Sequence, residues 1–279
     1  MTKRKMLSYT DTNSPIHALT GAAKLVIFLL WSVLVMVSFK TPVLVILAVF
    51  GIVLFNISKI RFSEVSFIVK MMALFLVLNL AVIYLFSPEQ GVKIYQTRNV
   101  IWEGHGRFTL TWEQLFYEFN IFLKYITIIP PALLLIVTTH PSEFASSLNR
   151  IGVPYTASYS VSLTLRYIPD VQRDFETIYQ AQQARGLELS SKASWIKRLK
   201  RTVPLLLPLS ILSLDRIDVI SRAMELRGFG KNKKRTWYSH KPFKKADIIS
   251  LVVNVLFFIA GIWYTFHDGS RFYNPWALK

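Results

Sequence analysis

Two arginines, each followed directly by glycine, are the residues best placed to do chemistry. Arg185-Gly186 and Arg227-Gly228 close two long amphipathic segments. A guanidinium is planar and permanently charged, and its fork of N–H donors matches a carboxylate on a docked protein. Glycine beyond a last helical turn also supplies a left-handed cap, and a cation there suits the helix dipole. One such pair is most often only a cap, but two on adjacent helices indicate docking tips.

Other kinds of site chemistry find no support in the sequence. A nucleotide-binding loop is excluded, because Gly230-Lys231-Asn232 lacks both the upstream glycine and the hydroxyl of a Gly-Lys-Ser/Thr motif. The chain has no cysteine, which removes disulfides, thiolate metal sites and cysteine nucleophiles. No His-Glu-x-x-His motif or clustered aspartate pair occurs, and the histidines are scattered at positions 17, 105, 140, 240 and 267. We expect no catalytic residue, metal site or cofactor in this chain, so a membrane enzyme is the least favoured reading.

The composition indicates that these tips belong to a membrane protein. Of the 279 residues, 52% are hydrophobic, so much of the apolar surface must face lipid. The formal charge of +17 would suit nucleic acid, but the basic residues lie between long apolar runs. We therefore expect a lipid bilayer as partner and no nucleic acid.

Five apolar stretches approach the roughly 20 residues that a membrane span requires. They are Leu25–Phe39, Val43–Ile57, Val65–Phe86, Phe116–Thr138 and Ile248–Phe266. The break at Lys40-Thr41-Pro42 predicts a tight hairpin between the first two. Pro130-Pro131 and Lys124 predict that the fourth stretch is kinked and partly protein-facing.

The distribution of Lys and Arg predicts the orientation of the spans. Cations near the N-terminus and at Lys59 and Arg61 place both segments in the cytoplasm, and residues 87–111 outside. Residues 141–245 return to the cytoplasm with 19 Lys and Arg against 8 Asp and Glu, which is +11 of the total +17. The prediction is an all-α integral membrane protein with about five transmembrane helices, divided into a membrane domain 1–140, a cytoplasmic domain 141–245, and a last span with an external C-terminal tail, 246–279.

The cytoplasmic insert is long enough to need its own helices. Caps and periodicity predict three, Ser142–Arg150, Ala157–Arg185 and Ile196–Arg227. Pro169 predicts a bend in the second, and Pro204 and Pro208 predict a bend or break in the third. On the second helix one face is expected to carry Ile168, Val171, Phe175 and Ile178, and the opposite face Asp170, Arg173, Asp174 and Glu176.

Three stretches make the chain resemble the transmembrane T component of energy-coupling factor (ECF) transporters, the EcfT/CbiQ family. The first is Ser14-Pro15-Ile16-His17-Ala18-Leu19 with Lys24-Leu25. The second runs from Leu148 through Gly152-Val153-Pro154 and Leu165-Arg166-Tyr167-Ile168-Pro169 to Ala181-Gln182-Gln183-Ala184-Arg185-Gly186. The third is Ser221-Arg222-Ala223-Met224-Glu225-Leu226-Arg227-Gly228-Phe229-Gly230. The family signature is Ala-Arg-Gly at both helix ends, and here the second end has Leu226 in place of alanine.

The resemblance implies a coupling mechanism. It implies that Arg185 and Arg227 contact carboxylates on two ABC ATPase subunits, which carry ATP and Mg²⁺. It implies that Ala184, Gly186, Leu226 and Gly228 shape the tips. The apolar residues Phe175, Ile178, Ile220 and Met224 would pack between the helices or against a small membrane S component. The cargo would be a vitamin, a vitamin precursor or a transition metal selected by the S component.

Two further readings remain open. A conventional ABC permease with its own substrate path would place polar residues in the spans, where Lys70, Asn79 and Lys124 are found, with Asn56 and Asn254 nearer the ends. The basic clusters Lys231–Arg235 and Lys241–Lys245 would in addition attract anionic headgroups.

Overall fold

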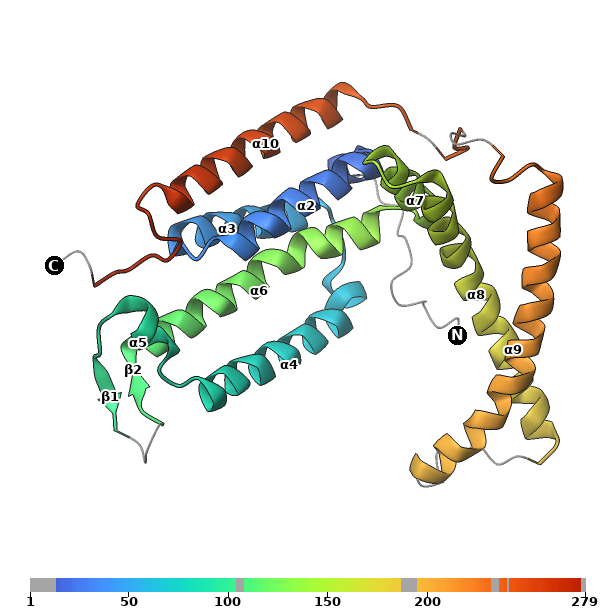
Figure 1. Ribbon diagram of the computed structural model, residues 1–279, viewed down its shortest axis with the longest axis horizontal. Helices are drawn as coiled ribbons and strands as arrows, with labels where there is room; N and C mark the ends of the chain where they lie inside the picture. The colour runs from blue at the N-terminus through green and yellow to red at the C-terminus, as the bar shows by residue number, and fades with distance from the viewer. Residues whose placement is uncertain (1–13, 104–107, 187–194, 232–235, 240, 277–279) are drawn as a thin grey trace. The chain divides into compact units, whose positions relative to one another are not determined.

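The structure is a computed structural model that describes residues 14–103, 108–186, 195–231, 236–239 and 241–276, with the backbone alone for residues 64 and 195–201. The chain divides into two compact units. Residues 1–140 and 241–279 form the first, here called the membrane unit, and residues 141–240 form the second, the insert unit. Figure 1 shows that helices dominate both.

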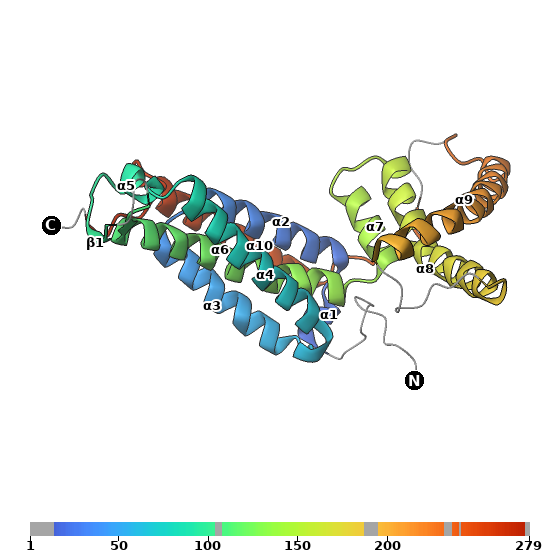
Figure 2. The ribbon, with the colours of Figure 1, turned by 90° about the horizontal axis from the view of Figure 1, so that it is seen from below.

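Apolar helices occupy all five positions predicted for spans. In the membrane unit, α2 (Gly21–Val37) and α3 (Thr41–Ile57) have 17 residues each. The helices α4 (Phe62–Phe86), α6 (Trp112–Thr138) and α10 (Lys245–Phe266) are long and apolar enough to cross a bilayer. Figure 2 shows these five helices running alongside one another.

Short elements connect the apolar helices. A single-turn helix α1 (Pro15–Ala18) precedes α2. Between α4 and α6 lie α5 (Gln90–Tyr95) and two strands, β1 (Val100–Trp102) and β2 (Leu110–Thr111), paired antiparallel. The all-helical prediction therefore missed a small ribbon, whose strands contain the β-branched and aromatic residues that favour extended backbone.

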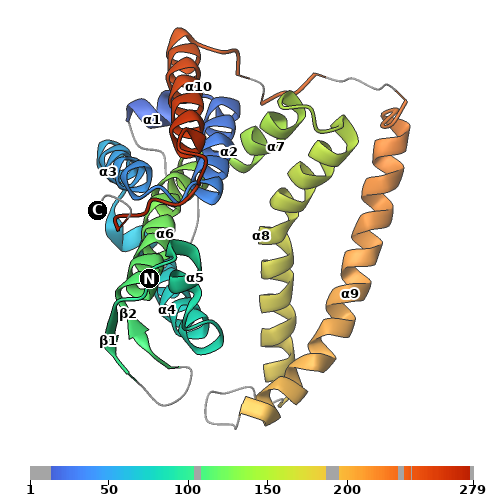
Figure 3. The same ribbon diagram turned by 60° about the vertical axis from the view of Figure 1, so that its left-hand side comes forward.

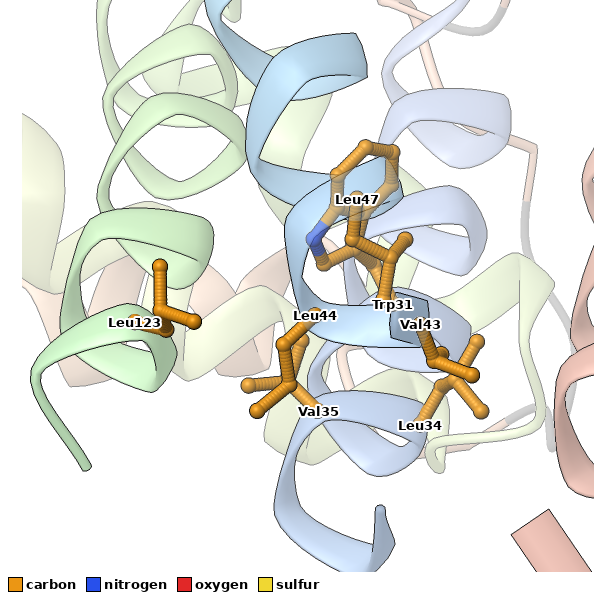
Figure 4. Packing of buried hydrophobic residues seen from close by; sticks show 7 residues of the cluster. All are labelled: Trp31, Leu34, Val35, Val43, Leu44, Leu47 and Leu123. Carbon is orange, nitrogen blue, oxygen red and sulfur yellow. The ribbon is translucent and has the colours of Figure 1, made fainter. Parts of the chain in front are cut away.

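The predicted short connection between the first two apolar helices is confirmed, since α2 ends at Val37 and α3 begins at Thr41. The facing surfaces of α2, α3 and α6 form a tightly packed core, shown in Figure 4. Its buried members are Trp31, Leu34, Val35, Val43, Leu44, Leu47 and Leu123. The indole Nε1 of Trp31 donates to the carbonyl of Thr127 at 3.2 Å, which satisfies the one polar atom of that side chain.

The helix α6 lies at the centre of the membrane unit. Half of the residues in its most apolar stretch are buried, as predicted for a protein-facing span. Pro130 and Pro131 sit inside one uninterrupted helix. The ammonium of Lys124 donates to the carbonyl of Met36 at 3.0 Å and lies 3.1 Å from the centre of the Phe39 ring, so the protein itself accommodates this charge within the span.

Polar contacts fasten α10 to α2 at both ends. At one end the buried carboxylate of Asp247 accepts from the amide and the hydroxyl of Thr20 at 2.7 and 3.2 Å. At the other the hydroxyl of Thr265 donates to Ser38 at 3.0 Å. Lys40, with a buried side chain, pairs with Asp268 at 2.7 Å just beyond α10.

The insert unit contains α7 (Pro141–Arg150), α8 (Tyr155–Ala184) and α9 (Trp195–Leu226), at the positions predicted for its three helices. Of the bend or break predicted at Pro204 and Pro208, a break does not occur, because both prolines lie inside one continuous helix. Figures 1 and 3 show instead that α9 bends in its N-terminal half, as prolines that remove helical hydrogen bonds allow.

Candidate docking tips of the insert unit

The helices α8 and α9 form an antiparallel pair (Figure 3). Near the middle, Arg216 of α9 donates to the carboxylate of Asp174 of α8 at 2.6 Å, with both side chains mostly buried. At the end where α8 begins and α9 finishes, the Tyr159 and Phe229 rings lie 4.8 Å apart. The contact partners thus run in opposite directions along the two helices.

The first tip is the C-terminal end of α8. The Arg185 amide donates to the carbonyl of Ala181 at 3.2 Å, and Gly186 follows with φ +87° and donates to Gln183 at 3.0 Å. Such a φ is strained for residues with a Cβ, so the glycine is required for this cap. Ala184, Arg185 and Gly186 are all exposed. A Cβ placed on Gly186 would meet no atom of the described residues within 4 Å.

The second tip is the C-terminal end of α9. Gly228, with φ +67°, donates to Glu225 at 2.8 Å, and Phe229 donates to Met224 at 2.9 Å. This pair of bonds is the Schellman arrangement, which fixes the direction in which the chain leaves the helix. Leu226 is 90% exposed and Arg227 is also exposed, so this tip presents an apolar side chain next to its cation.

An aromatic cluster supports the second tip. Phe229 lies 5.9 Å from Tyr155 and 4.8 Å from Tyr159, and Trp237 lies 5.3 Å from Tyr155, measured between ring centres. The indole of Trp237 also donates to the side chain of Asn149 in α7 at 3.1 Å. The sequence analysis missed this cluster, although tyrosines four residues apart and an aromatic residue directly after the capping glycine are a visible signal.

The two tips lie at opposite ends of the helix pair. Tyr159 marks the end that carries Arg227, and Arg185 lies about 26 residues further along α8, or about 40 Å at the helical rise of 1.5 Å per residue. One bound protein would have to span that distance to contact both tips. The geometry therefore suits two docking partners, one at each end.

The predicted packing residues lie along the facing sides of the two helices. Phe175 and Ile178 of α8 and Ile220 and Met224 of α9 are all half-buried. On α9 the residues of reduced exposure recur every three or four positions, as expected for one face. They are Thr202, Leu205, Leu209, Ser213, Arg216, Ile220 and Met224.

Two residues of α8 depart from the faces predicted for them. Asp174 was placed on the outward face, yet it pairs with Arg216 of α9. Its spacing, three residues after Val171 and four before Ile178, already puts it on the apolar face. Ile168 was placed on the buried face but is 46% exposed.

The remaining surface of α9 is apolar and uncovered. Among the residues from 202 onward only Leu205 is buried, and several large aliphatic side chains are more than half exposed. They are Val203, Leu207, Ile211, Leu214, Ile217 and Val219. A surface of this kind marks contact with another protein or with lipid.

No cluster of three or more His, Asp or Glu side chains in the described part of the chain could hold a metal ion. The tips themselves present cations and, at Leu226, an apolar side chain, which suit binding to another protein surface.

Comparison with known proteins agrees with this geometry. The profile of the CbiQ family, described as cobalt transport protein, matches residues 12–238. The energy-coupling factor transporter transmembrane protein EcfT of Limosilactobacillus fermentum is 30% identical over 269 residues, covering 91% of this chain and 96% of the relative. EcfT of Staphylococcus aureus is also 30% identical, covering 88% and 91%, and EcfT of Brevibacillus brevis is 27% identical, covering 92% and 97%.

The apolar helices and these similarities define a multi-pass cell membrane protein of the transport class. The chain belongs to the CbiQ family and is a transmembrane (T) component of energy-coupling factor transporters. Such components are transport subunits and not catalysts.

Proposed function

We propose that the insert unit transmits ATP-driven motion from two cytoplasmic ABC ATPases to a substrate-binding membrane partner. Arg185 docks on one ATPase and Arg227 on the other, each pairing with a carboxylate, while ATP and Mg²⁺ bind to the ATPases. The observation that supports this proposal most directly is the position of two exposed, glycine-capped arginines at opposite ends of one helix pair. The ion pair between Asp174 and Arg216 joins the two helices of that pair. A planar guanidinium held at a helix tip favours geometrically specific pairing.

The charge distribution supports a cytoplasmic insert unit, with the N-terminus inside and the C-terminus outside. Residues 141–245 carry 19 Lys and Arg against 8 Asp and Glu, and segments so rich in cations are retained on the cytoplasmic side. Five spans then connect the two sides, with α2 and α3 as the short pair and the ribbon of β1 and β2 external.

The S component covers the apolar outward face of α9 in this proposal. Val203, Leu207 and Leu214 on that face are exposed, whereas Ile220 and Met224 face α8 and serve packing between the helices. Selectivity for a vitamin, a vitamin precursor or a transition metal resides on the S component. The T component then supplies coupling without a substrate path of its own.

A double substitution tests the docking role. In the complete transporter, Arg185→Ala with Arg227→Ala is expected to leave the chain inserted and to abolish ATP-driven uptake, because truncating a charged partner at an interface costs about 2–5 kcal/mol. Uptake of labelled substrate into vesicles and co-purification of the ATPases are the two measurements.

Arg173→Ala is the matched control. Arg173 lies on the outward face of α8, paired with Asp170 of the same helix at 3.5 Å, and its side chain is 73% exposed. Its loss should leave uptake unchanged. Normal uptake by the double variant would refute the docking role. Uptake by this chain with ATPases alone, without any small membrane partner, would refute the proposed dependence on an S component.

A further inference from the structure

An apolar groove of about 490 Å³ opens on the membrane unit, between α2, α3, α6 and α10. Its walls include Phe28 and Trp31 of α2, Phe50 of α3, Leu134 of α6 and Phe257 of α10. The volume falls within the roughly 300–1,000 Å³ of typical ligand pockets.

The groove is open toward the hydrocarbon and not sealed inside the protein. Four of its lining residues, Ile46 and Phe50 of α3 and Ile249 and Val253 of α10, are between 43% and 63% exposed. Because these helices cross the bilayer, the molecules that reach the opening first are lipids.

The depth of the groove matches one leaflet. Along α10 the lining runs from Ile249 to Phe257, which is about 12 Å of helix, and along α2 it runs from Lys24 to Trp31, about 10 Å. Half of a hydrocarbon core of about 30 Å is about 15 Å. Most of the lining lies in the halves of the helices near the start of α2, the end of α6 and the start of α10, and Trp31 and Phe257 lie just past the midpoints of α2 and α10, so the groove lies mainly in a single leaflet.

The end of the groove nearest the membrane surface is polar and cationic. Lys24, which is buried, lines it, and its ammonium donates to the carbonyl of Thr138 at 2.9 Å. The hydroxyl of Ser250 and the amide of Asn254 are the other polar groups in the lining of α10. Two exposed lysines, Lys244 and Lys245, stand at the start of the same helix.

We infer that this groove is a specific site for one anionic phospholipid. One acyl chain lies against the aromatic walls, and the phosphate lies at the end formed by Lys24 and Ser250. Charge selects the class of lipid, since a neutral or zwitterionic headgroup gains less from these cations, while the concave wall distinguishes the site from the ordinary lipid-facing surface.

Titration of the purified full-length chain with phosphatidylglycerol or phosphatidylcholine, read by native mass spectrometry, tests the inference. We expect one phosphatidylglycerol to be retained per chain, with an affinity at least about fivefold above that for phosphatidylcholine for each lysine that contributes. Equal affinities, or no retained lipid, would overturn the inference.

Two adjacent valines supply a matched pair of variants. Val253→Trp places an indole in the groove and should abolish retention, whereas Val252→Trp, on a neighbouring position that does not line the groove, should not. If both variants retain the lipid equally, the lipid is not in this groove.

Lysine variants test the headgroup. Lys24→Gln should weaken phosphatidylglycerol about fivefold, and Lys244→Gln with Lys245→Gln, at exposed positions that do not disturb packing, should also weaken it. Lys59→Gln, an exposed lysine after α3, is the charge control and should leave the affinity unchanged. Retention by the isolated chain but not by the assembled transporter would assign the groove to a partner helix and overturn the lipid assignment.

Discussion

Two closely packed glycines of the membrane unit and the capping glycine of α8 serve opposite purposes. In the membrane unit a Cβ on Gly261 would lie 2.8 Å from the side chain of Leu34, and one on Gly91 would overlap the backbone of Glu113. In the insert unit a Cβ on Gly186 would meet none of the residues that the structure describes within 4 Å. At Gly261 and Gly91 the membrane unit is therefore filled by its own chain, whereas the tip of α8 leaves space that another protein can occupy.

Adding one methyl group to each of these glycines should give the largest difference between the units. Gly91→Ala is expected to destabilise the chain by about 3 kcal/mol, because backbone cannot move aside. Gly261→Ala should cost about 1–2 kcal/mol, since the end of Leu34 can shift. Thermal unfolding of the purified chain in detergent measures both.

Gly186→Ala is the counterpart in the insert unit. It should cost only about 1 kcal/mol, from the strain of a positive φ, but should reduce ATPase co-purification. Equal melting temperatures for the Gly91 and Gly186 variants would contradict the contrast between a closely packed site at Gly91 and an open site at Gly186.

The next largest effect should come from breaking the brace of the helix pair. Asp174→Ala leaves the mostly buried Arg216 without its carboxylate and should cost about 2 kcal/mol. Hydrogen exchange in α8 and α9 of the full chain should accelerate, and the exchanged pair Asp174→Arg with Arg216→Asp should restore protection in part. Asp170→Ala, at the exposed pair with Arg173, is the control and should have little effect. Unchanged exchange in the Asp174 variant would mean that apolar packing alone joins the helices.

A smaller effect should depend on pH in the membrane unit. The hydrogen bond from Lys40, together with that from His267, holds the pKa of Asp268 below its usual value of 3.8. A carboxyl whose pKa is lowered by folding adds stability above its unfolded pKa, and that stability is lost as pH falls through the folded pKa. The melting temperature of the wild type should therefore fall as the pH drops below about 4. The Asp268→Asn variant should lack this part of the decrease. An identical pH profile for the two proteins would contradict the assignment.

The smallest effect is expected for Leu226→Ala, which restores the family signature at the second tip. Because this side chain is 90% exposed, its removal should change stability by less than about 0.5 kcal/mol and uptake only slightly. A large loss of uptake with normal stability would show that the ATPase groove is shaped for leucine, and would make the two tips functionally unequal.

Local signals predicted much of this fold. Gly186 and Gly228 gave the ends of α8 and α9 to within one residue, because a capping glycine acts through its own backbone. The contact between Thr20 and Asp247 could not be predicted in the same way, since it joins positions 227 residues apart and a lone aspartate at a helix start already has a local explanation. The site was predicted as two tips, but their placement at opposite ends depends on the antiparallel pairing of α8 and α9, which no local pattern encodes.

The fastening of α10 to α2 has a consequence for biogenesis. The Thr20 donors at the start of α2 and the hydroxyl of Ser38 at its end find their partners on α10, and the amide of Phe39 donates to the carbonyl of Arg271 at 3.0 Å. During synthesis α2 is made first and α10 last. The polar groups at the ends of α2 therefore have no α10 partners until the final span inserts. Truncation before residue 245 would leave α2 open along one side and expose the chain to quality-control proteolysis.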